Sequence, residues 1–136
     1  MGTDANPNMS SAVVHNGIVT TMGVIDAGGG SIEDQTQNVL DKIDALLKEA
    51  KTDKSKLLTA NIWLKDIAKD FAAMNSVWVK YIDANNKPVR ACVEANMARP
   101  QVLVEIQVTA ACGQSWDWMK WNDMNEWRAR RFFSTT

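Results

Sequence analysis

The sequence predicts an α+β fold in which two helices cover one face of a single mixed β-sheet. Segments with strand-like alternation and segments with a three- to four-residue apolar period follow the order hairpin, helix, strand, helix, strand, strand. This interleaved order favours one mixed sheet with its helices on one side. A chain of 136 residues is long enough for one domain with its own core. We expect that domain at 12–111, between a flexible N-terminus (1–11) and a tryptophan-rich C-terminal extension (112–136).

A β-hairpin is predicted at the start of the domain. Two apolar pairs, Val13-Val14 and Ile18-Val19, flank the dipeptide Asn16-Gly17. Both turn residues tolerate a positive φ, which makes this dipeptide a strong hairpin signal. The glycines at 28–30 then predict a loop, because the lysine of a phosphate-binding P-loop is missing.

A first helix is predicted between Ser31 and Ala50. Ser31 and Asp34 resemble a capping pair, and acidic residues suit the positive end of a helix. The apolar residues recur at helical steps: Thr36, Val39, Leu40, Ile43, Leu46, Leu47 and Ala50. The polar segment at 51–56 predicts a turn.

A strand at 57–66 and a second helix at 68–85 are predicted next. Alternation in the strand places one set of residues on its buried side: Leu58, Ala60, Ile62 and Leu64. The second helix has one apolar face, which consists of Phe71, Met74, Trp78 and Tyr81. Asn75 is a polar residue at the edge of this face. Pro88 disfavours helical geometry in the residue before it and therefore ends the helix.

The segment at 87–111 predicts the last two strands. In the second of them, one face is apolar and belongs to the core: Val102, Val104, Ile106, Val108 and Ala110. The opposite face is mostly polar, so it faces solvent, another subunit or a pocket: Leu103, Glu105, Gln107 and Thr109. Arg90 and Glu105 stand out, because each is a charged residue inside a strand.

Composition argues against several classes of partner. The formal net charge is −1, from 15 Lys and Arg against 16 Asp and Glu, so no affinity for nucleic acid is expected. The N-terminus lacks the pattern of a secretory signal, and no apolar run reaches membrane-spanning length, so we expect a cytoplasmic protein without a membrane partner. Cys92 and Cys112 have no metal-type spacing; a disulfide stays open, although reduced thiols are favoured. His15 is expected to be a solvated turn residue.

Four segments resemble successive blocks of the Rid/YjgF family of reactive intermediate deaminases, also called the endoribonuclease L-PSP family. They read QTQNVLDKIDALLKEA, FAAMNSVW, PVRACVEA and LVEIQVTA. The resemblance implies a chorismate-mutase-like subunit, a homotrimer and ligand clefts between subunits. It also implies hydrolysis of enamines and imines such as 2-aminoacrylate to 2-keto acids and ammonia, without a cofactor or a metal.

The resemblance also implies which residues form the site. It places the essential arginine at Arg90 and a glutamate that positions water at Glu105, with substrate-binding positions at Gly23, Asn75 and Cys92. An arginine fork matches a carboxylate bidentately, and a glutamate within hydrogen-bond distance can act as a general base for water. The expected ligand is therefore a small carboxylate metabolite.

From the residues alone, two other interpretations stay open. Arg90 could form a surface ion pair with Glu94 or Asp83, which usually contributes little stability. Glu105 could be a solvated charge on the polar strand face.

The sequence departs from the family pattern around the glycine. Many deaminating members have a Ser-Gly-Gln triplet there and a tyrosine near the N-terminus, whereas this chain has Met22, Gly23 and Val24, and its only tyrosine is Tyr81. We count Met22 and Val24 among the substrate-binding residues, and their apolar side chains favour a bulkier or less polar ligand. Alternative functions are a carboxylate-binding trimer without efficient turnover and a regulatory or chaperone-like interaction protein.

The extension at 112–136 carries four of the six tryptophans: Trp116, Trp118, Trp121 and Trp127. Trp121, Met124 and Trp127 could form one side of a short helix. We expect the extension to pack on its own subunit or a neighbour, because exposed tryptophans reduce solubility. Binding of a separate partner is the alternative.

Overall fold

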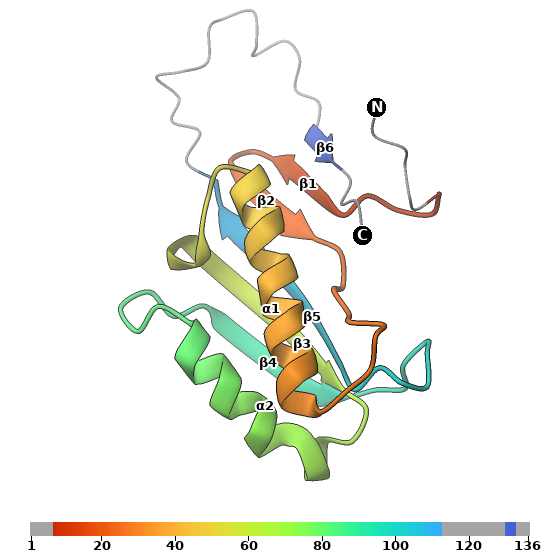
Figure 1. Ribbon diagram of the computed structural model, residues 1–136. Coiled ribbons are helices and arrows are strands. Elements are labelled where there is room, and N and C mark those ends of the chain that lie inside the picture. The colour runs from red at the N-terminus through yellow and green to blue at the C-terminus, as the bar shows by residue number, and fades with distance from the viewer. Residues whose placement is uncertain (1–6, 113–129, 133–136) are drawn as a thin grey trace, which may run out of the picture.

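The computed structural model describes residues 7–112 and 130–132 (Figure 1). Its elements, in chain order, are β1 (Ala12–His15), β2 (Ile18–Thr21), α1 (Ile32–Glu49), the 3₁₀ helix η1 (Lys54–Lys56), β3 (Leu57–Leu64), α2 (Ile67–Tyr81), β4 (Val89–Glu94), β5 (Val104–Ala111) and β6 (Arg130–Phe132). The strands form one sheet in the order β4-β3-β5-β2-β1-β6. The β3–β4 pair is parallel and the other pairs are antiparallel.

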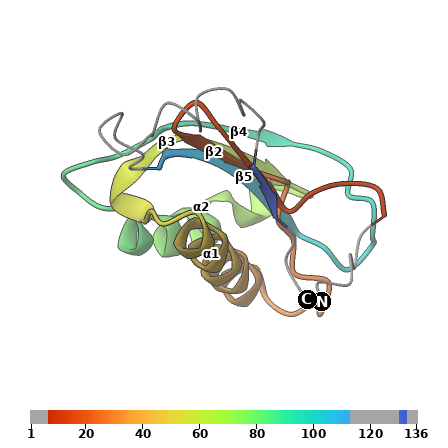
Figure 2. The ribbon, with the colours of Figure 1, turned by 90° about the horizontal axis from the view of Figure 1, so that it is seen from above.

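Both helices pack against the same face of the sheet, as the view from above shows (Figure 2). This arrangement confirms the predicted α+β class and the mixed sheet with its helices on one side. We call the face opposite the two helices the open face. In the described part of the chain, no helix is long and apolar enough to cross a membrane.

The predicted hairpin and the predicted start of the first helix are both confirmed. Asn16 and Gly17 have φ values of 53° and 72°, and His15 pairs with Ile18, so a two-residue turn joins β1 to β2. The Ser31 side chain accepts a hydrogen bond of 3.1 Å from the backbone N–H of Asp34, which caps α1.

The second helix ends at Tyr81, four residues before the predicted end. Ile82 is extended, and the Asp83 side chain accepts a hydrogen bond from the backbone N–H of Asn85. This turn formed by a side chain competes with helical hydrogen bonding, so α2 stops before Pro88 can end it.

Two predicted core residues are exposed. Leu58 is 42% exposed because a β-bulge between Leu57 and Thr59 shifts the alternation, so Leu57 takes the buried side instead. Phe71 is 38% exposed, whereas the other residues predicted on its helix face are buried: Met74, Trp78 and Tyr81.

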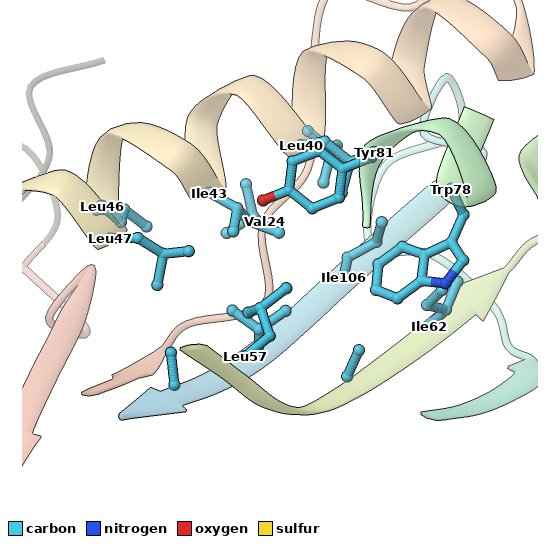
Figure 3. Close-up of a cluster of buried hydrophobic side chains, with 14 of the residues drawn as sticks. Val24, Leu40, Ile43, Leu46, Leu47, Leu57, Ile62, Trp78, Tyr81 and Ile106 are labelled. Carbon is cyan, nitrogen blue, oxygen red and sulfur yellow. The ribbon is translucent and has the colours of Figure 1, made fainter. Parts of the chain in front are cut away.

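The core lies between α1, α2 and the sheet (Figure 3). Leu40, Ile43 and Leu47 of α1 face the sheet, where Ile62 of β3 and Ile106 of β5 are neighbours on the central strands. These side chains are fully buried, and their burial provides most of the stabilising free energy.

A buried glutamine fixes the loop that leads into β5. Gln35 Nε2 donates hydrogen bonds to the carbonyl oxygens of Gly30 and Gln101, and its Oε1 accepts one from the backbone N–H of Leu103. These contacts tie the start of α1 to the loop before Val104 and so set where β5 begins.

One described part of the C-terminal extension belongs to the sheet. Strand β6 pairs antiparallel with β1, with Ala12 opposite Phe132, and covers the edge that β1 would otherwise expose. Sequence analysis did not predict this strand. The predicted helix at Trp121, Met124 and Trp127 lies outside the described residues, as do Trp116 and Trp118.

Candidate functional site

Arg90 lies beneath α2, on the helix-covered side of the sheet. In the parallel β3–β4 pair, Arg90 is the partner of Ala60, which is 1% exposed and faces the helices. Register partners share a face, so Arg90 points toward α2. Its Nη1 donates a hydrogen bond of 2.6 Å to Asn75 Oδ1. Its Cζ is 5.8 Å from the ring centroid of Phe71 and 5.6 Å from that of Trp78.

All three groups that hold the guanidinium are neutral: an amide oxygen and two aromatic rings. The carboxylates considered as ion-pair partners bind elsewhere. Glu94 accepts a hydrogen bond from the backbone N–H of Ile67, and Asp83 accepts one from Asn85. Within residues 7–112 and 130–132, the positive charge of Arg90 has no anionic partner.

Cys92 lies on the same side of β4 as Arg90, because its register partner is the buried Ile62. It is half-buried, and both cysteines of the chain are free. Burial raises the pKa of the Cys92 thiol, and the positive charge of Arg90 opposes this shift. A raised pKa keeps the thiol neutral at neutral pH, which suits a residue that lines the site and not a nucleophile.

Glu105 lies on the open face. Its neighbours in β5, Val104 and Ile106, are buried under the helices, so the side chain between them points the other way. Its register partner in β3 is Trp63, which is half-buried on the same face. Among the described residues, no side chain or backbone group donates a hydrogen bond to the Glu105 carboxyl group.

Gly23 lies directly beneath the Glu105 side chain. The chain places Thr21, Met22 and Gly23 between the pairs Thr20–Thr109 and Val24–Ile106, where β5 has only two residues. This extra residue is a bulge. A Cβ at position 23 would lie 2.8 Å from Glu105 Cδ, so the carboxyl group needs a glycine there.

The other two residues of the predicted triplet differ in exposure. Met22 is half-buried and packs against the core. Val24 is 1% exposed, because it pairs with Ile106 on the helix side of the sheet. In Figure 3 its side chain lies beside Ile43 in the core. Val24 therefore presents no surface to a ligand in this subunit, and we leave it out of the candidate site.

The predicted residues thus form two groups on opposite sides of one sheet. The arginine half-site contains Arg90, Asn75 and Cys92, with Phe71 and Trp78; the glutamate half-site contains Glu105 and Gly23, with Trp63. A single chain does not bring Arg90 and Glu105 together. No three His, Cys, Asp or Glu side chains of the described ranges cluster as a metal ion requires.

Sequence analysis missed the aromatic contacts of Arg90. It placed Phe71 and Trp78 in the core stripe of the second helix and Asn75 at the edge of that stripe. The three residues follow the spacing i, i+4, i+7, which puts them on one helix face. This spacing, on a helix that packs over a strand with an arginine, is the sequence signal that could have predicted the contacts of Arg90.

We predict that Gly23→Ala displaces the Glu105 side chain and lowers the free energy of unfolding by about 1–3 kcal/mol, as overpacking does. In a Glu105→Ala background, Gly23→Ala should lower the free energy of unfolding only slightly, because the Glu105 side-chain atoms that the new Cβ would meet are absent. Chemical denaturation of the four proteins of this double-mutant cycle measures the coupling. Gly28→Ala is the matched control, since its Cβ would meet only Asp26 Oδ1, at 3.2 Å. Additive losses for Gly23→Ala and Glu105→Ala would contradict the contact.

Comparisons with known proteins match this chain over most of its length. A model of the Endoribonuclease L-PSP family matches residues 3–112. The RutC family protein YoaB of Escherichia coli K12 is 39% identical over 108 residues, which cover 79% of this chain and 94% of YoaB. A crystal structure of a YjgF-family protein from Neisseria meningitidis superimposes with a TM-score of 0.77 at 41% identity, over 81% of this chain and 92% of that one. A Rid-family protein of unknown function from Yersinia pestis superimposes with a TM-score of 0.73 at 32% identity, over 79% and 90%. The chain therefore belongs to the endoribonuclease L-PSP family, which includes the RutC and YjgF proteins.

Proposed function

We propose that the protein is an imine deaminase that hydrolyses reactive 2-imino acids to 2-keto acids and ammonia. The observation that carries this proposal is the charge of Arg90, which neutral groups hold in place and which no carboxylate of residues 7–112 and 130–132 neutralises. Family membership supports it, because the family resemblance implies this reaction. The substrate class is a small 2-imino acid or its enamine tautomer.

Arg90 binds the carboxylate of the substrate. A guanidinium carries five N–H donors in a rigid plane and stays protonated at every physiological pH. One Nη1–H is used by Asn75, so the Nε and Nη2 edge is available for a bidentate carboxylate. A charge that is already fixed and partly desolvated attracts an anion more strongly than a free surface arginine does.

Glu105 holds the attacking water and accepts its proton. The water oxygen adds to the carbon of the protonated imine, and the proton that the water loses passes to the Glu105 carboxylate. The nitrogen of the resulting carbinolamine takes up that proton, and the C–N bond breaks as the C–O bond becomes a carbonyl. The hydroxyl proton leaves with the ammonia as ammonium, and the 2-keto acid is released. A carboxyl group without an internal hydrogen-bond donor is free for this exchange. Because the imine is already electrophilic, positioning supplies most of the catalysis.

The complete site forms between two copies of the chain. Arg90 and Glu105 lie on opposite sides of the sheet, so the arginine half-site of one subunit must meet the glutamate half-site of another. Exposed apolar residues support such an association: Ile18, Leu58, Val89 and Val93. Contacts between different surfaces close into a ring, and the homotrimer that the family resemblance implies is such a ring.

The activity is tested with a 2-imino acid that an amino-acid oxidase generates in situ. We expect the protein to raise the rate of 2-keto acid formation above the rate in buffer. Arg90→Lys should lower kcat/KM about 10- to 100-fold, because a lysine loses the bidentate, charge-assisted contact. Arg99→Lys is the matched control, since Arg99 is an exposed loop residue outside the site. A rate equal to that in buffer, or equal activity of Arg90→Lys and wild type, would refute the proposal.

The shared site is tested by mixing two inactive variants. Co-expression of Arg90→Ala with Glu105→Gln should restore activity at about a quarter of the sites, because a randomly mixed ring brings an intact Arg90 next to an intact Glu105 at that frequency. Each variant alone should be inactive. A site inside one subunit would give no recovery, since every subunit then lacks one of the two groups.

A further inference from the structure

Three residues of α2 surround the Arg90 guanidinium. Phe71, Asn75 and Trp78 lie on one helix face over two turns, which span about 10.5 Å along the axis. The Arg90 Cζ lies 5.8 Å from the Phe71 ring centroid and 5.6 Å from the Trp78 ring centroid, within cation–π range of both. Asn75 contacts the guanidinium from the turn between these two residues.

We propose that Phe71 and Trp78 are positioning residues that fix the guanidinium plane of Arg90, so that only a planar carboxylate approaching in that plane is bound. This inference rests on the proposed function and adds the residues that determine its ligand geometry. Cation–π contact with two rings restricts rotation of the guanidinium and limits the directions from which a ligand can approach it. Asn75 Oδ1 accepts a hydrogen bond from Arg90 Nη1. The edge of the guanidinium formed by Nε and Nη2 is left for the two oxygens of a carboxylate.

The two rings are held differently. Trp78 is 4% exposed, and its ring centroid lies 6.1 Å from that of Tyr81. Both side chains are labelled in the core in Figure 3. The Tyr81 hydroxyl donates a hydrogen bond of 2.6 Å to Asp44 of α1, and Lys54 Nζ lies 5.0 Å from the Tyr81 ring centroid. Burial, with the Asp44 carboxylate, raises the pKa of Tyr81 and keeps this donor protonated. Trp78 is therefore anchored to α1, whereas Phe71 is 38% exposed and its ring is directed at Arg90.

This difference makes Phe71 the position to test. An exposed ring can be altered without opening a cavity in the core, whereas truncation of Trp78 removes a large buried side chain. Replacing Phe71 with phenylalanines that carry one, two or three ring fluorines keeps the shape and withdraws electron density from the ring face. A cation–π contact weakens along this series, but simple packing does not.

Two properties are measured for each protein in the fluorinated series. The first is rotation of the Arg90 guanidinium, measured by side-chain ¹⁵N NMR of the ligand-free protein, with the Arg90→Lys spectrum assigning the signal. The second is the Kd of pyruvate, used as a planar carboxylate probe. From mono- to trifluoro-phenylalanine we expect faster rotation and a Kd raised about two- to five-fold, as loss of an exposed cation–π contact implies. Trp78→Phe should shift both readouts in the same direction.

Val79→Ala is the matched control on the same helix. Val79 is 59% exposed and offers Arg90 neither a ring nor a hydrogen bond, so this substitution should leave the Arg90 rotation and the Kd of pyruvate unchanged. Rotation that is independent of fluorination, or an unchanged Kd for pyruvate, overturns the inference. If both readouts follow the series but no 2-imino acid is hydrolysed, the positioning role stands and only the proposed deaminase activity fails.

Discussion

The contact between Arg90 and α2 is the constraint on which the candidate site depends. A positive charge on a half-buried strand is normally balanced by a carboxylate, because an unpaired charge in a poorly hydrated position is costly. Here an amide oxygen and two rings hold the charge without neutralising it. The parallel β3–β4 pair makes this geometry possible, because it places β4 at the sheet edge beneath α2. The fold thus fixes the Arg90 guanidinium without an anionic partner among the described residues.

The two-residue period of a strand explains why Arg90 and Glu105 lie on opposite faces of the sheet in one chain. Arg90 shares a face with Ala60 and Ile62, whereas Glu105 lies between two buried residues of β5 and points to the opposite face. A shift by one residue in β5 would put both groups on one side, but it would also expose the buried residues of that strand. The buried alternation of β5 therefore keeps Glu105 on the face opposite Arg90, and the proposed site requires a second subunit.

Much of the fold could be predicted because its signals are local. The Asn16-Gly17 turn, the Ser31 cap and the alternation of β5 depend on a few adjacent residues, and each was confirmed. The features that the sequence did not predict depend on interactions between segments that are distant in the chain. The bulge at Leu57 is set by pairing with β5, and Phe71 lies near the Arg90 guanidinium and not in the core. The burial of Val24 depends on its bridge to Ile106, and β6 depends on a pairing with β1 across more than a hundred residues. The positions of Arg90 and Glu105 within strands were visible in the sequence, but the partners of Arg90 were not.

The uncompensated charge of Arg90 is tested most directly by Asn75→Asp. This substitution keeps the shape of the side chain and places a carboxylate where the Asn75 oxygen accepts its hydrogen bond, 2.6 Å from Arg90 Nη1. We expect an internal ion pair that leaves the fold at least as stable and abolishes pyruvate binding in calorimetric titration. Asn75→Ala, which adds no charge, should retain measurable binding. Wild-type affinity for pyruvate in Asn75→Asp would contradict the account, because it would mean that the ligand is held by something other than the free charge of Arg90.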